Sequence, residues 1–87
     1  MYNEDKIILK DENGVEKEYY KLIIFNSNIT NKDYIIYTDN TYSNNILNIY
    51  SSIILDDNKI EKITDDIDLK EVEKAIIKVK AQLGNDS

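Results

Sequence analysis

The chain has 87 residues, a formal net charge of −6 and a pI of about 4.5, and all 11 of its positive side chains are lysine. It contains no cysteine, histidine or arginine. These absences exclude disulfide bonds, the usual ligands of zinc and haem, nucleophile–histidine dyads and bidentate guanidinium recognition of phosphate. No metal or other cofactor is expected. The length predicts one domain over residues 1–87, ordered over about 6–83 and frayed at 1–5 and 84–87.

Charge and hydropathy predict the surroundings of the protein. A net negative charge disfavours contact with nucleic-acid backbones and anionic membranes. No apolar run approaches the ~18 residues of a membrane helix, and the acidic segment Met1–Asp5 lacks the basic region of a signal peptide. We therefore expect a cytoplasmic protein. The abundance of isoleucine, asparagine, lysine and tyrosine is typical of an AT-rich bacterial genome.

The first predicted element is a β-hairpin. Lys6–Lys10 is a β-branched run, and Asn13–Gly14 follows as a strong turn signal, because both residues tolerate positive φ. A three-residue loop with a bulge at the glycine sets Lys10 opposite Glu16. A two-residue loop sets Lys10 opposite Lys17, a repulsive pair, so the bulged register is favoured.

The second predicted strand, Val15–Phe25, changes from alternating to continuous apolar residues at Leu22–Phe25. This change indicates either a strand buried on both faces or a bulge. Three more strands are predicted at Tyr34–Thr38, Ile46–Leu55 and Lys59–Ile63, with polar loops at 26–33, Asp39–Asn45 and Asp56–Asn58 between them. Because strand follows strand through short connections, an antiparallel meander of about five strands is expected.

A C-terminal helix is predicted from a change of period. Its apolar residues fall within an arc of about 80° and are Leu69, Val72, Ile76, Val79 and Leu83. Thr64 or Asp65 can cap its start, and Gly84 supplies a left-handed stop. The fold class is therefore α+β, with one helix packed on one face of the sheet. Ile77 points about 90° away from the stripe, and is either an isolated surface residue or the edge of a partner surface.

The acidic clusters offer candidate cation sites, each with a simpler interpretation. Asp65, Asp66 and Asp68 could supply oxygen ligands, but helix capping and complementing the helix dipole is the favoured role. The stretches beginning at Asp39 and Asp56 lack residues that a calcium loop needs. No catalytic, metal-binding or cofactor-binding residue is assigned.

Tyrosine is unusually frequent, with seven residues. Packing is favoured over base stacking, because the surrounding charge is negative, for these tyrosines of the predicted strands: Tyr19, Tyr34, Tyr37 and Tyr50. Tyr2 and Tyr42 are expected to be exposed. Together with Ile77 they are the candidate residues of a partner surface.

Several segments are similar, in order and spacing, to a known family. They are Lys10–Gly14 with Glu16, Tyr34–Asn40, Tyr50–Ile53, and Ile63 followed by Asp65–Asp66 and Leu69–Glu73. Over residues 6 to 80 the chain resembles the small bacterial family catalogued as domain of unknown function 1292. The resemblance implies a cytosolic protein of low-GC bacteria, and implies no enzyme class, ligand or catalytic residue.

These observations predict a non-catalytic protein, a small protein-binding or accessory module. Its partner is expected to be another protein rather than nucleic acid or a membrane, and its state a monomer or weak homodimer. The alternative is an acidic inhibitor or nucleic-acid mimic that occupies a basic groove of a partner protein. Such a mimic should lose affinity steeply with added salt.

Overall fold

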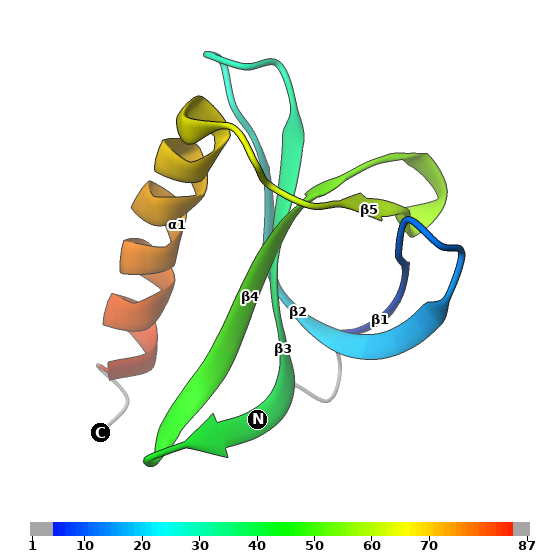
Figure 1. The fold of residues 1–87 in the computed structure, drawn as a ribbon. Coiled ribbons are helices and arrows are strands. Elements are labelled where there is room, and N and C mark those ends of the chain that lie inside the picture. Colours follow the sequence, from blue (N-terminus) through cyan, green and yellow to red (C-terminus); the bar gives the residue numbers. More distant parts are fainter. Residues whose placement is uncertain (1–4, 85–87) are drawn as a thin grey trace.

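The computed structural model describes residues 5–84. Five strands form one antiparallel sheet in the order β1-β2-β3-β4-β5, and one helix lies against a face of it (Figure 1). The elements are β1 (Lys6–Lys10), β2 (Glu16–Asn26), β3 (Asp33–Ser43), β4 (Ile46–Ile54), the short 3-10 helix η2 (Asp56–Asn58), β5 (Ile60–Glu61) and α1 (Asp66–Gly84). The predicted α+β meander with one C-terminal helix is confirmed.

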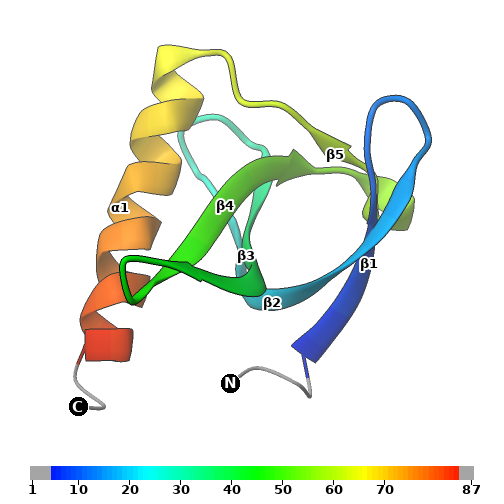
Figure 2. The same ribbon diagram turned by 60° about the horizontal axis from the view of Figure 1, so that its bottom comes forward.

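The sheet is strongly curled, so that its two edges approach each other (Figure 2). An isolated parallel bridge between Lys10 and Lys59 links the end of β1 to the chain just before β5. Successive residues of β3 point to opposite faces, and the curl therefore separates two small cores. Leu9, Ile35 and Tyr37 are buried inside the curl. The other core lies between sheet and helix and consists of Tyr34, Ile53 and Val72, with Phe25 and Ile63 packed against it.

The hairpin between β1 and β2 has the predicted bulged register. Lys10 lies opposite Glu16, and Gly14 adopts φ +83°. The Asp11 carboxylate stabilises the turn, because its Oδ1 accepts the N–H groups of Asn13 and Val15, each at 2.9 Å. The preference for the bulged register over the like-charge pair is confirmed.

The apolar run in β2 marks a bulge, the second of the two predicted alternatives. The pairing with β3 shifts between Lys21 and Ile23. The run is not buried on both faces, because Ile23 and Ile24 are 38% and 43% exposed.

The segment predicted as a loop at Asp39–Asn45 is mostly strand. β3 continues to Ser43 through a register shift between Thr38 and Tyr42, and only two residues turn the chain. These are Asn44 and Asn45, with φ of 53° and 68°. Asparagine tolerates this left-handed conformation, and two such residues form the turn that suits a two-residue hairpin. Conversely, β5 is shorter than predicted and spans only Ile60–Glu61.

Helix α1 begins as predicted but presents a different face to the sheet. Asp65 caps it, since its Oδ1 accepts the Ile67 N–H at 2.8 Å. Leu69, placed by the pattern on the buried face, is 46% exposed, so that assignment is wrong. The residues that the helix buries are Asp68, Val72, Ala75 and Val79.

This buried face is rotated from the predicted one by about 50°, at 100° per residue. The physical reason is Asp68, whose carboxylate binds β3 and the preceding loop and so turns its own side of the helix inward. Ile76 is half-buried, and the side chain of Leu83 lies outside the described residues. Within residues 5–84, no helix has the length and apolar character needed to cross a membrane.

Candidate functional site

A cleft opens where the β1–β2 hairpin meets β4 and β5. It has a volume of about 450 Å³. We call it the tyrosine cleft; its lining residues are Asp11, Glu12, Asn13, Tyr37, Tyr50, Ser51, Ser52, Ile60, Glu61 and Lys62. The curl of the sheet creates this cleft, because it brings the hairpin loop against residues some fifty positions later, and the Glu12 Oε2 accepts the Lys62 N–H at 3.2 Å.

The wall of the cleft is built on a cluster of three tyrosines. Tyr19 packs edge-on against Tyr37 with ring centroids 4.7 Å apart, and Tyr37 lies 5.7 Å from Tyr50. Such geometries are favoured by the ring quadrupoles. Tyr37 is buried and its hydroxyl shares a 2.9 Å hydrogen bond with Ser52 Oγ, whereas Tyr50 is 38% exposed. The cluster therefore packs against Tyr50 and leaves its ring partly exposed.

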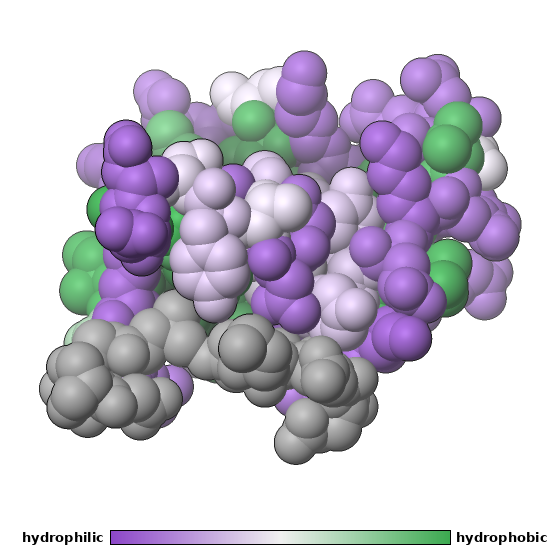
Figure 3. Space-filling view, turned by 90° about the horizontal axis from the view of Figure 1, so that it is seen from below, coloured by the Kyte–Doolittle hydropathy of each residue, from purple (hydrophilic) through white to green (hydrophobic). Residues whose placement is uncertain are grey.

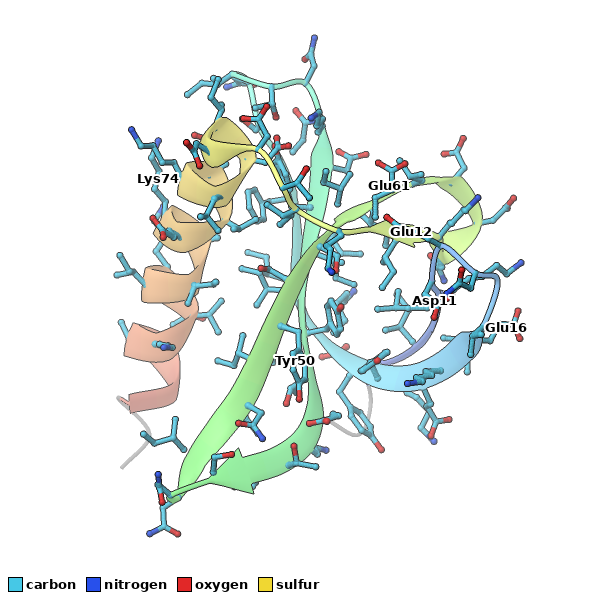
Figure 4. All side chains as sticks on the ribbon, in the orientation of Figure 1. Asp11, Glu12, Glu16, Tyr50, Glu61 and Lys74 are labelled. Carbon is cyan, nitrogen blue, oxygen red and sulfur yellow. The ribbon has the colours of Figure 1, made fainter. Side chains whose placement is uncertain are left out.

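Carboxylates line the hairpin and β5 sides of the cleft. Glu12 and Glu61 lie near one another where the hairpin meets β5, and Tyr50 projects from β4 below them (Figure 4). Asp11 supplies a third carboxylate, and Lys62 is the one basic residue among those that line the cleft. The cleft is therefore net negative. Figure 3, which views the molecule from below, shows hydrophilic residues over most of the right-hand side, that of β1 and β2, and hydrophobic residues at the left, next to α1.

Burial and hydrogen bonds shift the pKa values of the two cleft tyrosines and of the neighbouring Asp39. Burial raises the pKa of Tyr37. The hydrogen bond of 3.1 Å from the Tyr50 hydroxyl to Asp39 Oδ2, together with burial, raises the pKa of Tyr50. The Asp39 pKa is lowered, first by the hydrogen bond from the Thr41 hydroxyl. At neutral pH both tyrosines are thus uncharged hydrogen-bonding groups and Asp39 is ionised.

Away from the cleft, the buried carboxylate of Asp68 holds α1 to the sheet. Asp68 is 2% exposed; its two oxygens accept hydrogen bonds from the Tyr34 hydroxyl at 2.5 Å and from Lys32 Nζ at 2.9 Å. Glu71 lies about one helical turn after Asp68, and its Oε1 accepts a hydrogen bond of 2.8 Å from Ser27 Oγ. These contacts are structural. The sequence does not predict these contacts, because Asp68, like Asp65 and Asp66, is interpreted from it as a residue that caps the helix or complements its dipole.

The residues predicted for a partner surface are not brought together as one site. Tyr42 is 56% exposed near the end of β3, and Ile77 is 68% exposed on the outer side of α1. Neither lines the tyrosine cleft. Tyr2 lies outside the described residues.

The cleft carries no metal-binding geometry in the part of the chain that the structure describes, where no three acidic side chains gather as metal ligands would. No protein-family model matches the chain, and neither a curated protein nor a solved structure gives a match. The similarity to domain of unknown function 1292 therefore stays a prediction from the residues quoted above.

Proposed function

We propose that this chain is a non-catalytic protein-binding module whose tyrosine cleft binds a basic segment of a partner protein. The observation that carries the proposal is the convergence of carboxylates from the hairpin and β5 on an exposed tyrosine held by an aromatic cluster. Carboxylates attract ammonium and guanidinium groups, and the face of an aromatic ring attracts a cation within about 6 Å.

The dimensions of the cleft agree with this role. Its volume of about 450 Å³ lies in the range of about 300–1,000 Å³ that is typical of ligand pockets. It opens on the surface and is shared by three segments, the hairpin loop, β4 and β5. An extended chain could cross it and insert one or two long side chains. The net charge of −6 would also increase the rate of encounter with a basic partner.

The states of the cleft residues support binding rather than catalysis. The Asp11 carboxylate is engaged in the hairpin turn, and Glu12 is bonded to the backbone of Lys62. Both lining tyrosines have raised pKa values, so they are poor bases at neutral pH. A general base needs a pKa near the working pH and a free acceptor atom. The groups that remain available, such as Glu61, the second oxygen of the Glu12 carboxylate and the ring of Tyr50, are suited to contact a cation.

The test uses a capped hexapeptide in which arginine alternates with serine, and calorimetry or amide-shift titration as the readout. Replacing Glu12→Gln and Glu61→Gln together should weaken binding about 3- to 10-fold, because an exposed ion pair contributes up to about 1 kcal/mol. The matched control removes two acids outside the cleft, Glu18→Gln and Glu73→Gln, and should leave affinity nearly unchanged. A peptide with citrulline in place of arginine should not bind.

The same measurements separate this proposal from the acidic inhibitor. Exposed acids outside the cleft, such as Glu18 and Glu73, favour that alternative, because a mimic would use charge spread over the surface. Under the mimic, both double variants should weaken binding equally, and affinity should fall steeply with salt. That result, or no binding of the arginine peptide at all, would overturn the cleft proposal.

A further inference from the structure

Within residues 5–84, the outer edge of β2 has no paired strand along its second half. β1 pairs with β2 only from Glu16 to Tyr20, whereas β3 pairs with β2 as far as Asn26. No other strand within residues 5–84 pairs with the outer side of 21–26. In an antiparallel sheet, every second residue directs its N–H and C=O to the same side. This stretch therefore presents backbone donors and acceptors to an incoming strand.

The open edge begins at Lys21 and the bulge that follows it, and its uncharged part is Leu22–Phe25. Proteins protect such edges with proline or with charged side chains, above all lysine. Leu22–Phe25 contains neither. Ile23 and Ile24 are 38% and 43% exposed, and as neighbours in a strand they point to opposite faces. Apolar surface thus flanks the free backbone groups on both sides of the sheet.

A groove next to this edge adds a chemical preference. It lies between β2 and α1, has a volume of about 250 Å³, and is lined by Ile23, Phe25, Glu71, Lys74, Ala75 and Lys78. The apolar residues can accommodate a side chain from an added strand. Glu71 is already engaged by Ser27 and Lys74, at 2.8 and 3.2 Å, whereas Lys78 forms no ion pair with another described residue. The side of α1 that lines the groove therefore carries two lysines, Lys74 and Lys78, and one carboxylate, Glu71, in a protein whose net charge is negative.

We propose that the outer edge of β2 at Leu22–Asn26 accepts an extended strand of a partner protein, in which apolar side chains alternate and a carboxylate faces Lys78. Main-chain hydrogen bonds would supply affinity, and the groove with its lysines would supply selectivity, as in known cases of strand addition. This edge does not line the tyrosine cleft, and the proposal is independent of the function assigned to that cleft.

Charge disfavours a second copy of the chain as the occupant. Antiparallel pairing of two β2 edges relates the copies by a two-fold axis perpendicular to the sheet, which places both helices on the same face. The flanks carrying Lys74 and Lys78 would then face each other. Each copy also carries a charge of −6, and like charges oppose such pairing.

The test uses isotope-labelled protein and a capped eight-residue peptide in which valine alternates with threonine and one central threonine is replaced by glutamate. Binding should slow hydrogen exchange of the outward-facing amides within 22–26 at least about tenfold. A peptide of the same sequence, N-methylated at alternate residues, loses half of its backbone donors and should not protect these amides. The peptide with glutamine in place of glutamate should bind about 3- to 10-fold more weakly.

Two protein variants complete the test. Lys78→Gln should abolish the preference for glutamate over glutamine, while Lys80→Gln, an exposed lysine of the same helix, should retain it. Ile24→Lys places a charge on the edge and should prevent binding, with its thermal stability as a check on folding. The proposal fails if the N-methylated peptide protects the edge equally well or if no amide of 22–26 is protected. It also fails if the free protein sediments as a dimer that Ile24→Lys converts to a monomer.

Discussion

The Tyr34 hydroxyl donates a hydrogen bond of 2.5 Å to Asp68 Oδ1, and both residues are buried. This bond joins the central strand β3 to the first turn of α1. Lys32 Nζ completes the arrangement at 2.9 Å from the other carboxylate oxygen. The buried charge is thus compensated from two sides, which is the condition for keeping a carboxylate in a core. Because Asp68 has one position on the helix, the contact fixes the rotation of α1 as well as its location.

Tyr34→Phe should destabilise the protein while leaving its fold intact. The substitution keeps the ring in the core and removes the donor to Asp68, and a hydrogen bond to a charged group is worth about 1.5–3 kcal/mol. We expect a decrease of this size in the free energy of unfolding, measured by urea denaturation. Tyr42→Phe is the matched control, since Tyr42 is 56% exposed and should change stability by less than about 0.5 kcal/mol. Equal stabilities for the two variants would show that the buried bond contributes nothing.

Acid should weaken the contact between α1 and the sheet. Hydrogen bonds from Tyr34 and then Lys32 lower the pKa of Asp68, and those from Ser27 and then Lys74 lower the pKa of Glu71. A carboxyl with a lower pKa in the folded state stabilises the protein above its unfolded pKa, and this stabilisation is lost as pH falls through the folded value. The free energy of unfolding should therefore decline from about pH 4 downward. Asp68→Asn should be less stable at pH 7 and show a shallower decline; a parallel decline would assign the acid sensitivity to other groups.

The helix face can be tested with one buried and one exposed residue of α1. Val72 is fully buried against Tyr34 and Ile53, whereas Ile77 is 68% exposed. Val72→Asp would leave an unpaired charge in the core, at a cost of several kcal/mol, and should unfold so small a domain. Ile77→Asp should melt within a few degrees of the parent protein. Circular dichroism during heating distinguishes them, and two similar melting curves would contradict the arrangement of the helix.

The parts of the fold that the sequence predicts well are those determined by adjacent residues. The bulged hairpin follows from Asn13–Gly14 and from the charges at positions 10, 16 and 17, which lie within a few residues of one another. The helix start at Asp65 is equally local, because the capping carboxylate and the N–H that it accepts are two residues apart. Backbone conformation and short-range hydrogen bonds decide both features.

The features that the sequence did not predict depend on contacts between distant segments. The rotation of α1 depends on Asp68 meeting Tyr34, 34 residues earlier, and an aspartate in a first helical turn is more simply interpreted as balancing the helix dipole. The tyrosine cleft joins Glu12 to Tyr50 and Glu61 through the curl of the sheet. Strand predictions give the order of the elements but not this curl, so only the tyrosine content hinted at an aromatic cluster.

The ionisation of Tyr50 should report directly on the cleft. Its pKa is raised chiefly by the hydrogen bond to the Asp39 carboxylate. Asp39→Asn removes that negative charge, and we expect a lower pKa for Tyr50, measured by ring-carbon NMR with Tyr50→Phe to assign the signal. A guanidinium bound in the cleft favours the phenolate and remains charged in alkaline solution. The arginine peptide should therefore also lower the pKa of Tyr50. A bound peptide that leaves Tyr50 unaffected would place the basic segment elsewhere on the surface.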